Sequence, residues 1–257
     1  MKNIEALLSS FPRNRPPLTD AHEHIFAAEY RLNRQGDAVV EGLAQRVEGW
    51  MHRRVATYSG QSPTLELGAG TLNHLKYETM SACYDIVEPF VELFSTQPLR
   101  NRLRHIYQDQ SEIPLQSTYA RIISVAVLEH MTSLPLELAR SGLLLKPEGL
   151  FQAGIPSEGG FLWWLGWRCT TGISYWVRNR LDYGVIMRHE HVNTASEILA
   201  LIHHLFGDVK VTRFPLPYEH LSLYAYIEAR IPNRAECERI LRFPLSGQSR
   251  PAVAAIW

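Results

Sequence analysis

The segment Thr64–Thr71, with the sequence TLELGAGT, constrains the fold of this chain more than any other. Its first four residues match a short buried strand, and two glycines, Gly68 and Gly70, follow directly. Glycine adopts backbone conformations that other residues avoid, and it lets a ligand approach the main chain closely. A strand that ends in such a turn, followed by a helix whose N-terminal N–H groups point at the ligand, is typical of ligand-binding α/β proteins. We therefore predict an α/β fold with a binding site at this turn.

The sequence of this turn is compared with the motifs of two classes of cofactor-binding protein. A dinucleotide-binding fingerprint has a third glycine five residues after the first, and Asn73 stands there, which disfavours a nicotinamide cofactor. The run from Glu66 to Gly70 instead resembles the first motif of the class I S-adenosylmethionine-dependent methyltransferases, although Leu72 stands where many members have a third glycine. The resemblance implies that Glu66 lies near the ammonium group of S-adenosylmethionine. It also implies that the methionine part of the cofactor lies against the backbone of Gly68, Ala69 and Gly70.

Two further acidic segments fit the same resemblance. The run YDIVE reads as a second short strand that ends in Glu88, 22 residues after Glu66. A carboxylate in that place is where the ribose hydroxyls of a nucleoside cofactor need an acceptor, so we predict that Glu88 binds the ribose. Residues 103–108 resemble the third strand of the same family. By resemblance, Asp109 accepts from the adenine amino group and Gln110 offers its backbone N–H.

Residues 121–130 form a nearly continuous apolar run, as expected of a central parallel strand that is covered on both faces. Its ending, Leu-Glu-His, resembles the segment of the same family that lines the cofactor pocket. The resemblance places Ala126 at the cofactor and leaves two roles open for His130, catalysis or capping of the following helix. Residues 150–156 read as a fifth strand.

The C-terminal third continues the α/β pattern. Thr194 and Glu197 form a capping box, which predicts a helix that begins there. Residues 208–212 and 221–231 then read as the last two strands. The resemblance covers about residues 60–156 and this end of the chain, and it implies that the last strand inserts antiparallel. It thus predicts a Rossmann-like, seven-stranded, mostly parallel sheet with helices on both faces.

We expect a single domain over residues 1–257, with a helical N-terminal cap over residues 1–60 and an inserted segment over residues 157–192. This segment is longer than most connections between strands, and it lies where class I methyltransferases commonly place substrate-recognition structure. Half of the six tryptophans fall within residues 163–167. Three interpretations stay open for them: a core helix, an acceptor pocket that includes Trp163 and Trp164, or a contact with a membrane surface or a second copy of the chain.

Residues 182–193 are dense in groups that donate, accept or take up a proton. An acceptor site needs such groups, so we predict that Tyr183 and Glu190 contact the acceptor. Imidazoles are neutral near pH 7 when unperturbed, which makes His189 and His191, together with His130, the candidate catalytic bases. The alternative is a hydrogen-bonded loop that only fixes the entry of the next helix.

The composition of the chain argues against several other classes of protein. Acidic and basic residues are equal in number, 26 each, which argues against a nucleic-acid-binding surface. No stretch reaches the roughly 18 apolar residues of a membrane span, and the first residues lack the apolar core of a signal peptide, so we expect a cytoplasmic protein. The three cysteines form no Cys-x-x-Cys pair. We predict no metal site, since the sequence places no third and fourth ligand beside His189 and His191.

These features predict transfer of a methyl group from S-adenosylmethionine to an O or N atom of a small-molecule acceptor, for example a sugar or a lipid-like molecule. The sulfonium methyl group is already reactive, so the protein mainly has to align the acceptor and exclude water. One alternative is a non-catalytic binding subunit with the methyltransferase fold. The other is a nicotinamide-dependent oxidoreductase.

Overall fold

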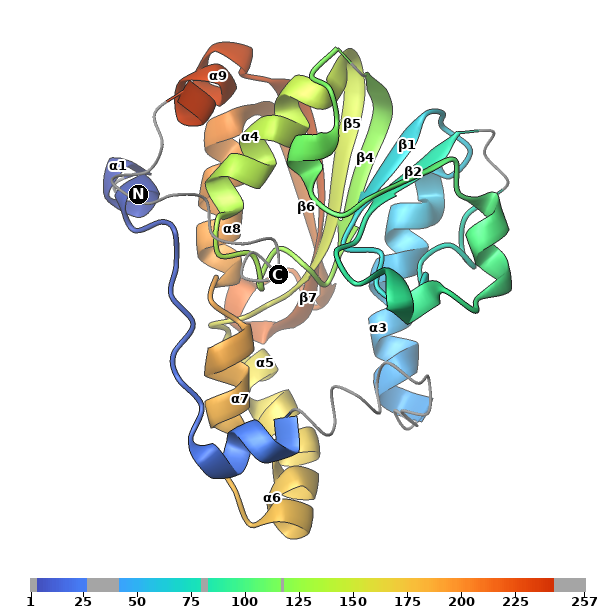
Figure 1. Cartoon of the computed structure of the whole chain (residues 1–257). Helices are drawn as coiled ribbons and strands as arrows, with labels where there is room; N and C mark the ends of the chain where they lie inside the picture. Colours follow the sequence, from blue (N-terminus) through green and yellow to red (C-terminus); the bar gives the residue numbers. More distant parts are fainter. Residues whose placement is uncertain (1–3, 27–41, 80–82, 117, 243–257) are drawn as a thin grey trace.

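One seven-stranded sheet forms the centre of the protein, in the strand order β3-β2-β1-β4-β5-β7-β6 (Figure 1). The structure is a computed structural model, and it describes residues 4–26, 42–79, 83–116 and 118–242. β1 to β5 are parallel, and β7 runs antiparallel to both β5 and β6. The strands are β1 (Thr64–Leu67), β2 (Tyr84–Val87), β3 (His105–Tyr107), β4 (Tyr119–Val125), β5 (Leu145–Pro156), β6 (Phe206–Pro215) and β7 (Ser222–Pro232). The predicted α/β fold and the antiparallel last strand are therefore confirmed.

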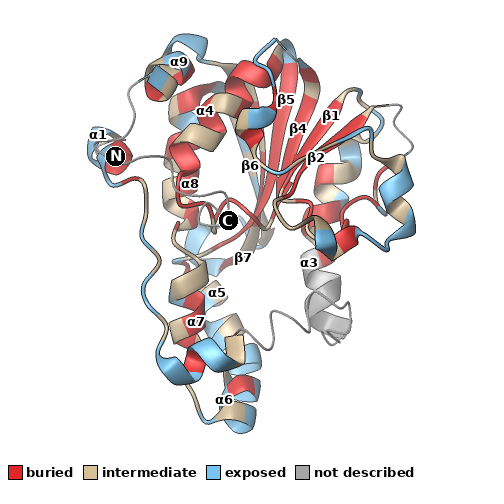
Figure 2. Ribbon diagram, viewed as in Figure 1, coloured by how far each residue is buried: buried red, intermediate tan, exposed pale blue. Residues whose placement is uncertain are grey.

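Helices cover both faces of the sheet, as predicted. α4 (Leu134–Leu144) and α8 (Ala195–Leu205) pack on one face, with α1 (Ile4–Ser9) and α9 (Arg234–Arg242) against them. α3 (Gly42–Val55) packs on the other face. Every residue of β1 and β2 is buried, because a parallel strand between two layers of helices has no exposed side. Figure 2 shows the buried strands at the centre of this sandwich.

α8 begins where the sequence predicts. Thr194 accepts a hydrogen bond from the Glu197 N–H at 3.3 Å, and the Glu197 carboxylate accepts one from the Thr194 N–H at 3.0 Å. Arg13 also donates to Glu197, at 3.0 Å. The capping box therefore starts the helix and also ties the N-terminal segment to this face of the protein.

The chain after β1 differs from the prediction. Residues 70–77 form a series of turns, and none of the described residues between β1 and β2 belongs to an α-helix. Leu72 has a left-handed backbone with φ of 62°, which an α-helix cannot include. The expected helix N-terminus at the glycine turn is therefore wrong, and a ligand there meets turn backbone instead.

The segment after β5 projects from the sheet as a group of short helices, which lie at the bottom of Figure 1. They are α5 (Phe161–Trp167), a π-helical turn (Arg168–Gly172), α6 (Ile173–Asn179) and α7 (Tyr183–Glu190). α5 buries none of its residues, and Trp164 and Trp176 are 44% and 53% exposed. The interpretation of the tryptophans as a core helix is therefore wrong. Among the described helices, none has the length and the apolar character to cross a membrane.

Candidate functional site

A cavity of about 590 Å³ lies at the carboxyl ends of β1, β2 and β4. This is the edge at which open α/β sheets bind their ligands, and the volume suits a small molecule. The fold brings together at its wall nine residues that were predicted from the sequence. They are Glu66, Gly68, Ala69, Gly70, Glu88, Ala126, His130, His189 and Glu190.

The other predicted residues lie outside this wall. Asp109 accepts a hydrogen bond from the Ser111 N–H at 2.6 Å, and the Gln110 amide is buried 2.8 Å from the Ser141 hydroxyl. Neither lines the cavity, so their contacts with adenine stay a prediction. Trp163, Trp164 and Tyr183 do not line the cavity either, so their contacts with the acceptor stay a prediction.

The glycine turn presents open backbone to the cavity. Gly68 and Gly70 have φ of 69° and 51°, in the left-handed region that favours glycine. A Cβ atom placed on Gly70 would meet no atom within 4 Å, so the space beside it is open. Leu72 and Ala126 adopt the same conformation with φ of 62° and 55°, at a cost of about 1–2 kcal/mol each. The left-handed backbone thus continues at Leu72, which is not a glycine.

Glu88 connects two of the loops around the cavity. Its side chain is almost fully buried, and its two oxygens accept hydrogen bonds from the Gly70 N–H at 2.7 Å and the Phe90 N–H at 3.0 Å. The carboxylate is thereby fixed in one orientation at the end of β2. Because a carboxylate oxygen accepts more than one hydrogen bond, this geometry is compatible with ribose hydroxyls as further donors.

Glu66 lies at the end of β1 and is also buried. The Tyr84 hydroxyl donates to its carboxylate at 2.8 Å. Burial raises the pKa of Glu66 to about 7, while the neighbouring His74 and the Tyr84 hydrogen bond act in the opposite direction. A cation bound in the cavity would stabilise the charged form of Glu66 and lower this pKa.

Residues 183–190 form helix α7, so the predicted loop is helical over most of its length. His189 donates from Nδ1 to the Pro16 carbonyl at 2.7 Å, and its ring meets Phe26 edge-on. Because a carbonyl only accepts, the proton is on Nδ1, and Nε2 of a neutral ring keeps its lone pair. In this tautomer, Nε2 of His189 is the ring nitrogen that can accept a hydrogen bond or a proton, and the residue lines the cavity.

His130 and His191 lie deeper, with ring centroids 4.8 Å apart. His130 donates from Nδ1 to the Glu190 carbonyl at 3.1 Å, and burial lowers its pKa to about 3. The N-cap residue of α4 is Ser133, so the interpretation of His130 as a helix cap is wrong. The ring of His191 is 2.7 Å from the carboxylate of Glu158. Burial acts to lower the pKa of His191, but Glu158 and neighbouring acids outweigh it and the pKa is raised.

Arg15 joins these elements through three backbone carbonyls. It donates to the carbonyls of His189 and Glu190, both at 3.0 Å, and to that of His130 at 2.9 Å. It also lines the cavity. Arg15 was not predicted from the sequence, since one arginine in an aperiodic segment gives no signal of a contact more than a hundred residues away.

A buried polar network lies beneath the cavity. His52 and His74 line the wall with their Nδ1 atoms 3.1 Å apart, and His74 Nε2 is 2.7 Å from the Glu78 carboxylate. Arg121 is fully buried and donates to both oxygens of Glu78, at 2.8 and 2.9 Å. Arg121 also donates to Gln152 at 2.6 Å. The network therefore joins the residues after β1 to β4 and β5.

Comparison with known proteins supports the assignment of the fold. No family model and no curated protein sequence matches the chain. An S-adenosylmethionine-dependent methyltransferase from Thermotoga maritima is 15% identical, with 81% of this chain and 99% of that chain covered and a TM-score of 0.56. An O-methyltransferase family protein from Burkholderia thailandensis is 14% identical, with coverage of 90% and 68% and a TM-score of 0.52. The N-methyltransferase NodS from Bradyrhizobium japonicum, in complex with S-adenosyl-L-homocysteine, is 14% identical, with coverage of 74% and 90% and a TM-score of 0.50.

Proposed function

Because this chain has the fold of the class I S-adenosylmethionine-dependent methyltransferases, we propose that it transfers a methyl group from S-adenosylmethionine to an O or N atom of a small-molecule acceptor. One observation carries the proposal. The glycine turn after β1 and the buried carboxylate of Glu88 after β2 face one cavity at the carboxyl edge of the sheet.

The residues at this cavity fit the cofactor. The space beside Gly70 would take the methionine part, which must approach the backbone closely. Glu66 supplies a carboxylate for the ammonium group, and Glu88 supplies fixed acceptors for the ribose hydroxyls. Adenine would extend toward the predicted contacts, Asp109 and Gln110. The donor set therefore suits a cationic amino acid joined to a nucleoside.

When bound, S-adenosylmethionine supplies an electrophilic methyl group, so the chain itself has to orient the acceptor, exclude water and take up a proton. His189 is the proposed base, because it lines the cavity and keeps a lone pair on Nε2. Glu190, the next residue, also lines the cavity and would contact the acceptor. Both belong to α7, so the segment after β5 would form the acceptor side of the site.

The Glu88→Ala variant tests the cofactor site. We expect it to lose about 1.5–3 kcal/mol of binding for each charge-assisted hydrogen bond to the ribose. Calorimetric titration with S-adenosylmethionine measures this loss, and Glu148→Ala, an exposed acid in β5, is the matched control. Circular dichroism verifies the fold of both variants. Unchanged affinity in Glu88→Ala would remove Glu88 from the site.

The same titration separates the alternatives. Binding of NAD in place of S-adenosylmethionine would indicate an oxidoreductase. Binding of S-adenosylmethionine without any turnover in a screen of amine and hydroxyl acceptors would indicate a non-catalytic subunit. We expect turnover of the methyl donor and no binding of NAD.

Cofactor affinity should depend on pH through Glu66. Its pKa of about 7 leaves it largely protonated below neutral pH, and a protonated carboxyl cannot pair with an ammonium group. The affinity for S-adenosylmethionine should therefore rise as the pH increases through 7, by up to about tenfold per unit below that pH, and then level off. The Glu66→Gln variant should bind more weakly and without this dependence. An identical pH profile in both proteins would contradict the assignment.

A further inference from the structure

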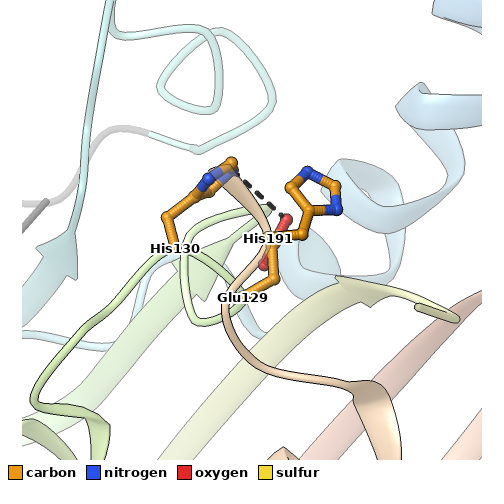
Figure 3. A group of neighbouring side chains, drawn as sticks. All are labelled: Glu129, His130 and His191. Carbon is orange, nitrogen blue, oxygen red and sulfur yellow. Dashed lines mark ion pairs between the residues drawn. The ribbon is translucent and has the colours of Figure 1, made fainter. Parts of the chain in front are cut away.

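Glu129, His130 and His191 come together beside the cavity (Figure 3). One ligand atom from each lies within 4.8 Å of the other two. Glu129 and His130 follow β4, whereas His191 follows α7, 61 residues later in the chain. No metal site was predicted from the sequence, because it places no third and fourth ligand beside His189 and His191.

We propose that Glu129, His130 and His191 bind a divalent transition-metal ion at the wall of the cavity. Two imidazoles and one carboxylate suit Zn²⁺, Co²⁺ or Mn²⁺, whereas Mg²⁺ and Ca²⁺ prefer sets made of oxygen ligands. Two ligands at about 2.1 Å from a tetrahedral ion lie roughly 3.4 Å apart. His130 Nε2 and the Glu129 carboxylate are already 3.8 Å apart, and the His191 ligand atom lies within 4.8 Å of both, so the His191 ring would have to move closer to complete the site.

Both histidines present the ring nitrogen that a metal requires. Histidine ligands usually donate their other N–H to a carbonyl or a carboxylate, which fixes the ring. His130 Nδ1 has the Glu190 carbonyl as its partner at 3.1 Å, and His191 Nδ1 has the Glu158 carboxylate at 2.7 Å. Nε2 of each ring is the remaining nitrogen and can bind the ion.

The tryptophan segment supports this arrangement. Trp163 donates from its indole N–H to the Glu158 carboxylate at 2.6 Å, and its ring stacks on His191 with centroids 6.3 Å apart. Trp163 thus holds Glu158, and Glu158 orients His191. This chain of contacts gives Trp163 and Glu158 positioning roles that do not require them to touch the cofactor.

Of the three ligands, His130 lines the cavity, whereas Glu129 and His191 do not and are more deeply buried. The side chains of Glu129 and His191 are 2% and 11% exposed, and that of His130 is 28% exposed and lines the cavity. The ion would therefore lie at the cavity wall. Three protein ligands leave at least one coordination position for another group.

The chemical consequence rests on the proposed function, and it narrows the acceptor to a hydroxyl compound. Coordination to the ion would lower the pKa of the acceptor hydroxyl. The O–H proton would pass to His189 Nε2, and the oxygen would form a bond to the methyl carbon. The C–S bond would break with its electron pair left on sulfur, which yields S-adenosylhomocysteine.

Titration of the metal-free, full-length chain with Co²⁺, followed by visible absorption, and with Zn²⁺, followed by calorimetry, tests the site. We expect one equivalent to bind. His191→Ala and Glu129→Gln should each weaken binding at least about 100-fold, and Glu158→Gln about 10–100-fold, since outer partners of metal ligands have effects of that size. His203→Ala, on the exposed face of α8, should bind like the wild type.

Absence of one-equivalent binding by the wild type would overturn the proposal. Equal affinity in the wild type, His191→Ala and Glu129→Gln would overturn it too. Far-UV circular dichroism of each variant shows whether the fold is kept, and Glu129→Gln preserves the shape of the side chain. Affinity for S-adenosylmethionine is measured separately. The wild type could bind the metal, the variants lose that binding, and the wild type fail to bind S-adenosylmethionine. That combination would support the metal site and reject the proposed function.

Discussion

Replacing Arg121 with methionine should lower the free energy of unfolding by about 3–5 kcal/mol, because it leaves a buried carboxylate without its main partner. Arg121 is fully buried and donates two hydrogen bonds to Glu78. Burial acts to raise the pKa of Glu78, but its hydrogen bonds with His74 and Arg121 outweigh burial and lower the pKa. Urea unfolding followed by circular dichroism measures the change.

Two further variants show whether the charge causes this effect. Adding Glu78→Gln to Arg121→Met removes the remaining buried charge and should recover part of the lost stability. Arg242→Met breaks an exposed ion pair with Glu238 and should cost at most about 1 kcal/mol. If Arg121→Met and Arg242→Met have equal effects, the buried network contributes little to stability.

The His189→Ala variant should lose about 10²–10⁴-fold in turnover, the usual effect of removing a general base. Its affinity for S-adenosylmethionine should stay close to that of the wild type, because His189 is assigned to the acceptor. Methyl-transfer assays with an accepted substrate measure the rate, and calorimetry measures the affinity.

Rescue experiments separate a base from a structural residue. Added imidazole should restore part of the activity of His189→Ala, since a small base can enter the space that the side chain leaves. His24→Ala, which changes an exposed histidine of the N-terminal segment, should keep normal activity and show no response to imidazole. Near wild-type turnover in His189→Ala across the pH range would mean that alignment alone carries the reaction.

The parts of the fold that were predicted correctly depend on local patterns. β2 and β4 appear as short apolar runs, and the capping box at Thr194 marks the start of α8 from four neighbouring residues. The antiparallel insertion of the last strand was predicted from the resemblance to a family. One local pattern gave a wrong prediction. The glycine turn suggests a following helix, but the left-handed backbone of Leu72 prevents it.

The parts of the candidate site that were missed depend on distant contacts. His52 and His74 are 22 residues apart, and neither belongs to a recognisable motif. Arg15 reaches carbonyls of residues 130, 189 and 190. Glu129 approaches His191 because its carbonyl accepts hydrogen bonds from the Val192 N–H at 2.9 Å and the Asn193 N–H at 3.1 Å. Such pairs arise only in the folded chain, so a single sequence does not reveal them.

The position of β7 has a consequence for folding during synthesis. β7 lies between β5 and β6, although it is the last of the described strands to leave the ribosome. Until residues 222–232 have emerged, one edge of β5 has no strand partner, and β5 is apolar and buried in the finished protein over residues 149–156. Exposed edges of this kind pair readily with other chains. Nascent chains that stop before residue 222 should therefore aggregate more readily than chains that extend past residue 232.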